Sequence, residues 1–286
     1  MVNKMKRSSE FNSKGKLYLI STPIGNLGDF SIRAIDTLKS LDFLFCEDTR
    51  VTKKLLSHFD INLETDSYHD HSDSKKEEKI ISMIKSGMNV GLVSDAGTPI
   101  ISDPGYEIVR RAIKEEITVI AIPGVTAQVT ALTMSTLAPK PYLFYGFLSQ
   151  EDKRRKDELE TLKNLPYTIV FYESPHRIYS LVKDLYNVFG DREITISREM
   201  TKIYEETIYF NLSEYESLPD NLKGEMVVCV EGYKEESKES MTMDEMLNEV
   251  KLLVEKENKT LKEASKIVAS KNNIKSSDLY NEYVKR

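Results

Sequence analysis

Residues 89–105 read NVGLVSDAGTPIISDPG, and this stretch indicates the fold class of the chain. Its apolar run VGLV has no polar residue for a solvent-facing side, which is typical of a strand covered on both faces and therefore of a parallel sheet. The twelve residues that follow, 94–105, contain two glycines, two prolines and two aspartates, so they predict a loop. In α/β proteins a loop at the carboxyl end of a strand is where ligands bind.

Strand-like runs and helix-period segments alternate on both sides of this stretch, as expected for an α/β fold. In the first half we predict strands at 17–22, 43–48, 89–94 and 117–123. Segments between them have helical periodicity, for example 31–41, 75–85 and 106–116. For the helix at 106–116 we expect Asp103 to be the N-cap and Pro104 to stand at the first helical position.

The second half has a different pattern. We predict strands at 141–148, 168–172, 193–198, 203–210 and 225–230. Some of their connections are too short for a crossover helix, which favours a mixed or antiparallel sheet with fewer helices. The domain boundary is predicted directly after Pro123-Gly124, so that the two α/β domains span 16–124 and 125–233, preceded by a flexible extension at 1–15.

The last segment, 241–286, has no strand signal. It predicts three short helices at 243–257, 261–270 and 276–285, which fits a helix-turn-helix-like bundle. The expected buried set is Ala264, Ile267, Val268, Ile274, Leu279 and Tyr283. Six lysines and two glutamates between positions 256 and 275 give a local charge of +4. This surface could bind nucleic acid, dock a protein, or be a solvated face.

Composition limits the partners and the compartment. The chain has 286 residues, with 40 Lys and Arg against 46 Asp and Glu, a net charge of −6. Bulk electrostatics will not hold nucleic acid on such a surface, so RNA contacts must come from local basic patches: residues 1–15, 153–156 and the lysines of the last segment. Cys46 and Cys229 give no disulfide framework, no apolar run approaches the roughly 20 residues of a membrane span, and the first residues do not form a signal peptide. We therefore expect a cytoplasmic protein with no membrane contact.

Three loops rich in small residues follow predicted strands: STPIGNLGD (21–29), SDAGTPIISDPG (94–105) and IPGVTAQ (122–128). The first lacks the spacing of the dinucleotide fingerprint, and in the second no lysine follows a glycine, which excludes a P-loop. Together they predict a pocket for a large, partly planar, weakly charged ligand. S-adenosylmethionine fits that description, as do other nucleosides.

Two polar clusters also lie at strand ends. FCEDTR (45–50) contains Glu47, Asp48 and Arg50, and FYESPHR (171–177) contains Tyr172, Glu173, His176 and Arg177. Both clusters could be helix-capping carboxylates with a salt-bridging arginine, but charges at the ends of buried strands need partners or a ligand, so we expect a site.

A third polar segment, YHDHSD (68–73), contains His69 and His71. No further histidine or cysteine stands at ligand spacing, so we predict a polar substrate loop and no metal site.

These motifs resemble those of the ribosomal RNA small subunit methyltransferase I family, which belongs to the tetrapyrrole-methylase-like, or class III, methyltransferases. The resemblance runs from about residue 16 to residue 233 and rests on TPIGN, EDTR, SDAGTP, IPGVTA and FYESPHR; the lysine-rich segment resembles that family's C-terminal helix-turn-helix domain. It implies two α/β domains with S-adenosylmethionine in the cleft between them, and a homodimer. The implied product is a 2′-O-methylated cytidine in the decoding region of 16S rRNA.

The resemblance also assigns residues to the cofactor. They are Pro23, Gly25, Ser94, Asp95, Ala96, Gly97, Thr98, Thr126, Ala127, Tyr172 and Glu173. One departure concerns the histidine loop, which reads YHDHSD where the family more often has YHEHNE.

Methyl transfer to a ribose hydroxyl needs a group that takes the hydroxyl proton. The candidates are Glu47, Asp48, Asp95 and Glu173, and we place Asp48 and Glu173 first as catalytic residues. The expected substrate-binding residues are Glu47, Arg50, His69, His71, His176, Arg177, Lys262 and Lys266. Two other functions stay open: a methylase of a small tetrapyrrole or other non-RNA acceptor, and a non-enzymatic nucleic-acid-binding regulator.

Overall fold

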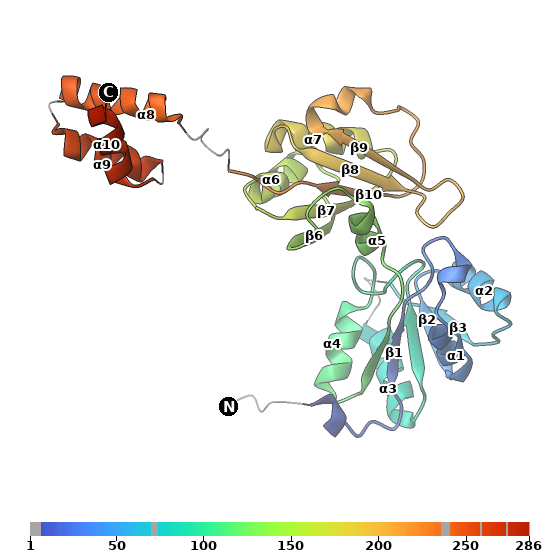
Figure 1. Cartoon of the computed structure of the whole chain (residues 1–286). Helices are drawn as coiled ribbons and strands as arrows, with labels where there is room; N and C mark the ends of the chain where they lie inside the picture. Colours follow the sequence, from blue (N-terminus) through green and yellow to red (C-terminus); the bar gives the residue numbers. More distant parts are fainter. Residues whose placement is uncertain (1–6, 70–73, 236–240, 258, 273, 286) are drawn as a thin grey trace. The chain divides into compact units, whose positions relative to one another are not determined.

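The computed structural model describes the chain except for residues 1–6, 70–73, 236–240, 258, 273 and 286. It forms two compact units, residues 1–233 and residues 234–286 (Figure 1). Within the described residues, no helix is both long enough and apolar enough to cross a membrane.

The first sheet has five strands in the order β3-β2-β4-β1-β5. They are β1 (Leu17–Ile20), β2 (Phe43–Cys46), β3 (Thr65–Ser67), β4 (Val90–Val93) and β5 (Val119–Ile122). All neighbouring strands run parallel, which confirms the prediction from the apolar runs. The strand β3 was not predicted, because its residues Thr-Asp-Ser are polar and only half-buried at the sheet edge.

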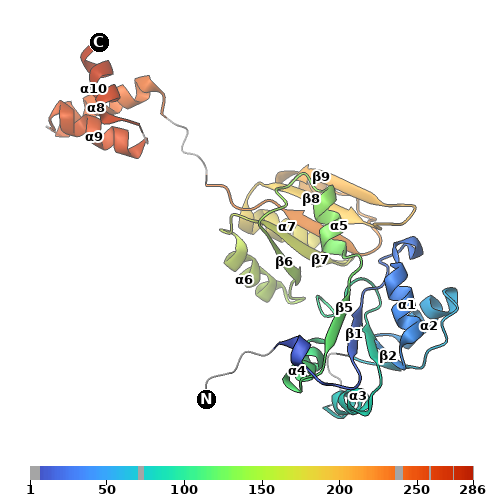
Figure 2. The same ribbon diagram turned by 60° about the horizontal axis from the view of Figure 1, so that its bottom comes forward.

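Helices cover both faces of this sheet (Figures 1 and 2). On one face, Ala34 and Leu38 of α1 (Ile32–Ser40) and Leu56 of α2 (Thr49–His58) pack against the strands. On the other face, α3 (Ser74–Ser86) and α4 (Tyr106–Lys114) bury isoleucines against a separate set of strand residues. Burial on both faces explains why these strands have no polar alternation.

The predicted start of α4 is wrong. The helix begins at Tyr106 after Gly105, whose φ of +135° is a conformation that L side chains rarely adopt. A Cβ at Gly105 would also lie 2.8 Å from Leu92 Cδ2. The chain therefore turns sharply at Gly105, and Asp103 and Pro104 remain in the loop before the helix instead of capping it.

The second sheet has the order β6-β7-β10-β8-β9. Its strands are β6 (Tyr142–Phe147), β7 (Thr168–Glu173), β8 (Glu193–Arg198), β9 (Glu206–Asn211) and β10 (Met226–Val230). The pair β6–β7 is parallel and the other pairs are antiparallel, so the predicted mixed sheet is confirmed. One face is covered by α5 (Ala127–Met134) and the other by α6 (Asp152–Leu162), α7 (Ile178–Phe189) and the 3-10 helix η3 (Leu212–Ser217).

Two features concern the predicted domain limits. Part of the predicted N-terminal extension is anchored to the first sheet's domain, because Gly15 N donates to Ile84 O and Thr118 N donates to Ser13 Oγ. The boundary after Gly124 stays a prediction, since residues 1–233 form one compact unit.

The second unit contains α8 (Met243–Glu257), α9 (Leu261–Lys271) and α10 (Ser276–Lys285), as predicted. Thr260 and Glu263 form a capping box at the start of α9. The three helices share a core that contains Val250, Ala264, Val268 and Leu279. Of the expected buried set, Ile267, Ile274 and Tyr283 are only half-buried.

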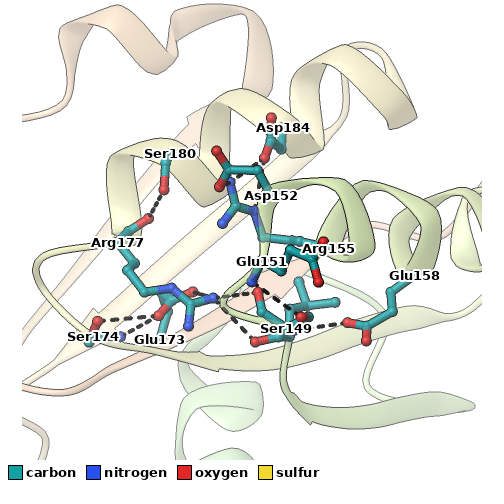
Figure 3. A network of polar contacts seen from close by, with 11 residues as sticks. Ser149, Glu151, Asp152, Arg155, Glu158, Glu173, Ser174, Arg177, Ser180 and Asp184 are labelled. Atoms are coloured by element: carbon teal, nitrogen blue, oxygen red, sulfur yellow. Dashed lines mark hydrogen bonds and ion pairs between the residues drawn. The ribbon is translucent and has the colours of Figure 1, made fainter.

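A buried ion pair joins α6 to α7 (Figure 3). Arg155 Nη2 lies 2.6 Å from Asp184 Oδ2, with side chains that are 5% and 8% exposed. The exposed Asp152 also contacts this guanidinium. Arg155 therefore does not contribute a free positive charge to the basic patch at 153–156. Its guanidinium faces inward, where the carboxylate of Asp184 on α7 neutralises its charge.

Replacing Asp184 with alanine should destabilise the protein by about 3 kcal/mol or more, because it leaves a buried guanidinium without its main partner. Urea unfolding followed by circular dichroism measures this loss. The matched control is Asp152→Ala, which removes a carboxylate that is 81% exposed and should cost less than about 1 kcal/mol. Equal effects of the two substitutions would contradict the role given to burial.

Candidate active site

A cavity of about 370 Å³ lies at the carboxyl ends of the strands of the first sheet. This size is suited to the binding of a small molecule. Each of the three small-residue loops contributes to its wall, through Ile24, Asp95–Thr98 and 126–128. The second sheet contributes the opposite residues, which are Phe147, Tyr172, Glu173, Glu199, Met200, Lys202, Glu225, Met226 and Val227. Residues far apart in the chain thus line one cavity.

Hydrogen bonds join the three loops into one wall. Thr22 and Gly97 exchange two backbone hydrogen bonds, Thr22 N to Gly97 O at 2.8 Å and Gly97 N to Thr22 O at 3.0 Å. The hydroxyls of Ser21 and Thr98 lie 2.9 Å apart, and Thr98 Oγ1 donates to Val125 O. The side chains in this wall are small, so a flat ligand can approach the backbone closely.

Most of the residues that the resemblance assigned to the cofactor line this cavity. They are Asp95, Ala96, Gly97, Thr98, Thr126, Ala127, Tyr172 and Glu173. Pro23, Gly25 and the buried Ser94 lie in the same loops but do not line it. The cofactor role of all eleven residues stays a prediction.

Tyr172 fixes the wall that α5 provides. Its hydroxyl donates to Gln128 Oε1 and accepts from Gln128 N, at 3.1 and 3.2 Å. Burial raises the pKa of Tyr172 to about 12, so the phenol keeps its proton at neutral pH. The side chain therefore holds the first turn of α5 beside the cavity.

Asp48 caps a helix and pairs with an arginine. Its Oδ1 accepts from Arg50 N, and Arg50 Nη2 lies 2.6 Å from Asp48 Oδ2. These hydrogen bonds lower the pKa of Asp48 to about 2. Neither residue lines the cavity, although Asp48 N donates to the cavity residue Asp95.

Glu173 lines the cavity but is already paired (Figure 3). This carboxylate is 2% exposed; its Oε2 lies 3.2 Å from Arg177 Nη2, and its Oε1 accepts from Ser174 N. Arg177 also donates to Leu148 O and Ser149 O. The pair thereby connects the end of β7, the start of α7 and the loop that follows β6.

Sequence reasoning missed Asp103 as a site residue, since it was assigned to a helix cap. Its side chain lines the cavity. Burial, and then the negative charges of Glu47, Asp95 and Glu225, raise its pKa to about 6, against the lowering effect of a hydrogen bond with Ser94. Two aspartates eight residues apart in one loop were the only sequence signal for it.

The other predicted substrate residues are dispersed. Glu47 lines the cavity, whereas Arg50, His69, His176 and Arg177 do not. His71 lies outside the described residues. Within the described ranges, no group of three or more His, Cys, Asp or Glu side chains is placed to hold a metal ion. Lys262 and Lys266 are exposed on α9 in the second unit, whereas Lys271 pairs with Glu249.

Comparisons with known structures define the class of protein. The profile of the family "Tetrapyrrole (Corrin/Porphyrin) Methylases" matches residues 16–216. A uroporphyrin-III-C-methyltransferase from Thermus thermophilus has a TM-score of 0.56 at 16% identity, covering 76% of this chain and 94% of that one. Another structure of that Thermus thermophilus enzyme, complexed with S-adenosyl homocysteine, has a TM-score of 0.55 at 18% identity, covering 75% and 97%. At these identities the structures show a shared fold.

Sequence relatives narrow the class. Proteins named "Ribosomal RNA small subunit methyltransferase I" are 43% identical in Bacillus subtilis, covering 98% of both chains, and 44% identical in Halalkalibacterium halodurans, covering 95% and 96%. The Vibrio cholerae relative of that name is 41% identical and covers 92% of each chain. The chain belongs to the tetrapyrrole methylase family and, within it, to the ribosomal RNA small subunit methyltransferase I family, so the resemblance drawn from the loop motifs is confirmed.

The raised pKa of Asp103 predicts a pH-dependent effect of Asp103→Asn on stability. The folded-state pKa of about 6 lies above the ordinary value of 3.8 for an aspartate, so the wild-type protein loses stability from this group as the pH rises from about 4 to 6. The Asp103→Asn variant does not lose this stability, because asparagine does not titrate. The melting temperature of the variant relative to wild type should therefore increase over that range and then stay level.

Asp48→Asn is the control with the opposite sign. The pKa of Asp48 is lowered to about 2, so the wild-type protein gains stability from this group as the pH rises from about 2 to 4. The melting temperatures of both variants and of the wild type, measured between about pH 2 and pH 6, test these two predictions. A relative melting temperature of Asp103→Asn that falls with rising pH would contradict the environment assigned to Asp103.

Proposed function

We propose that this protein transfers the methyl group of S-adenosylmethionine to the ribose 2′-hydroxyl of a cytidine in the decoding region of 16S rRNA. The observation that carries the proposal is the identity of 41–44% over nearly the whole chain to proteins named as small-subunit rRNA methyltransferases. The ribose position and the cytidine come from the resemblance of the loop motifs to that family.

The residues of the cavity fit S-adenosylmethionine. The small side chains of Asp95–Thr98 and of Thr126 and Ala127 leave room for a nucleoside against the backbone. The carboxylates of Glu47, Asp95, Asp103 and Glu225 suit the positive charge of a sulfonium. S-adenosylmethionine supplies an activated methyl group, so the protein has to align the acceptor, exclude water and take up one proton.

We assign the proton acceptor to Asp103. A base with a pKa near the working pH combines a substantial ionised fraction with useful basicity, and the pKa of Asp103 is raised to about 6. Asp48 is a weaker base, because Arg50 lowers its pKa to about 2. Glu173 is occupied by Arg177 and Ser174. Asp103 would accept the hydroxyl proton as the new carbon–oxygen bond forms and the carbon–sulfur bond breaks.

The acceptor in this proposal is the small ribosomal subunit, and the enzyme acts as a cytoplasmic homodimer. Lys262 and Lys266 support RNA contact by the second unit, since both side chains are exposed on one helix. Glu47, Arg50, His69, His71, His176 and Arg177 stay as proposed substrate contacts on the strength of the family motifs alone.

Transfer of a radiolabelled methyl group from S-adenosylmethionine to purified small subunits, followed by mapping of the labelled nucleotide, tests the proposal. Label in the ribose of a decoding-region cytidine is the expected result; Asp103→Asn should lower kcat by at least about 100-fold. The control Asp48→Asn should keep most of the wild-type kcat. Label in a base, or only in a small tetrapyrrole, would overturn the function, and a fully active Asp103→Asn enzyme would overturn the base.

A further inference from the structure

We propose that Phe147 is the stacking platform for the nucleobase of the acceptor nucleotide. The inference rests on the proposed function and adds the contact that would hold the acceptor in place. It starts from the position of Phe147, which stands at the end of the edge strand β6, lines the cavity and is 57% exposed.

An irregularity in β6 turns this ring to the cavity. In the first part of the strand, Leu143 pairs with Ile169 and Phe144 with Val170, so that alternate side chains face α6–α7 and α5. The register then shifts between Phe144 and Gly146, with Tyr145 as the extra residue. A shift of one residue sends every later side chain to the opposite face.

As a result, Phe147 pairs with Tyr172 instead of Glu173 and lies on the α5 face of the sheet, where its ring packs beside Tyr172 in the cavity wall. Continuous pairing would have placed Phe147 on the face of α6 and α7. Gly146 makes the bulge possible through its φ of +82°, and a Cβ there would lie 3.4 Å from Ser102 Oγ, on the loop that lines the cavity. The bulge at Tyr145 and Gly146 therefore turns the side chain of Phe147 toward the cavity.

Tyr172 supports the ring of Phe147. Its centroid lies 5.5 Å from that of Tyr172, with an interplanar angle of 67°. Tyr172 is held in turn by Gln128 and by Phe144, whose ring centroid lies 4.9 Å away. A ring that is fixed at its edge and more than half exposed presents a rigid apolar surface to whatever enters the cavity.

The charged side chains that line the cavity indicate which part of an RNA the ring of Phe147 binds. Six carboxylates line the cavity together with one lysine, Lys202, and that lysine is paired with Glu199. A phosphodiester is repelled here, so the backbone of the acceptor cannot be the group that the cavity attracts. The uncharged face of a base stacks on an aromatic ring without that penalty. Ile101, also on the cavity wall and 49% exposed, adds further apolar surface for it.

The test uses Phe147→Leu, Phe147→Trp and wild-type enzyme. Leucine keeps an apolar side chain but removes the ring, so KM for small subunits should rise roughly tenfold to hundredfold. Tryptophan should restore KM to near the wild-type value. The Kd for S-adenosylhomocysteine, measured by calorimetry, should change less than about twofold in both variants, which also shows that they are folded. Tyr167→Ala, at the amino end of β7 and 40% exposed, is the matched control and should leave both constants unchanged.

A second readout does not depend on methyl transfer. An RNA oligonucleotide of the decoding region that carries fluorescent pyrrolocytidine at the proposed target should be quenched on binding to the wild-type enzyme with S-adenosylhomocysteine, because stacking quenches this base. Phe147→Leu should abolish the quenching. Absence of quenching with the wild type, or a wild-type KM in Phe147→Leu, would overturn the inference. A loss of S-adenosylhomocysteine affinity in Phe147→Leu would overturn it in favour of the adenine of the cofactor. If the wild type quenches the probe through Phe147 but methylates no 16S rRNA, the proposed function fails and the stacking site stands.

Discussion

All five strands of the first sheet run parallel, and this constraint determines where the chemistry of the protein lies. Parallel strands bring their carboxyl ends to a single edge, so the loops after β1, β4 and β5 must meet there. The hydrogen bonds between Thr22 and Gly97 and between Ser21 and Thr98 then fix these loops to one another. A wall of small side chains and backbone results, and the carboxylates Glu47, Asp95 and Asp103 stand beside it.

The second sheet supplies rigid polar and aromatic groups opposite this wall. Its cavity residues depend on two interactions: the Glu173–Arg177 ion pair, which holds the loop after β6, and the paired hydrogen bonds of Tyr172 and Gln128, which hold α5. Neither interaction leaves a free charge. The proposed base, Asp103, belongs to the first wall, and the proposed stacking ring, Phe147, belongs to the second sheet.

Periodicity in the sequence predicted much of the fold. The strands of both sheets were found at nearly the observed positions, and β8 over Glu193–Arg198 and two of the three C-terminal helices matched in their bounds, because burial on defined faces imposes a strong pattern. The strand β3 was missed because an edge strand of three polar residues has no such pattern. The small-residue loops were also recognised, since glycine and proline at strand ends are explicit signals.

Side-chain direction within the site could not be predicted in this way. Asp48 and Asp103 both follow buried strands, yet one is bound by an arginine and the other is desolvated among carboxylates, a difference that depends on residues distant in the chain. Arg155 stands in a run of basic residues, and its burial depends on Asp184, which lies on the next helix. Phe147 depends on a one-residue register shift, which no hydrophobic pattern reveals.

We propose that the cavity lined by loops of both sheets is the cofactor site. A crystal structure of the protein with S-adenosylhomocysteine tests this most directly. We expect the nucleoside to lie against Asp95–Thr98 and against Thr126 and Ala127, with the sulfur near Asp103 and the ring of Phe147 still open to solvent. Electron density for the nucleoside at any other surface, with this cavity left empty, would contradict it.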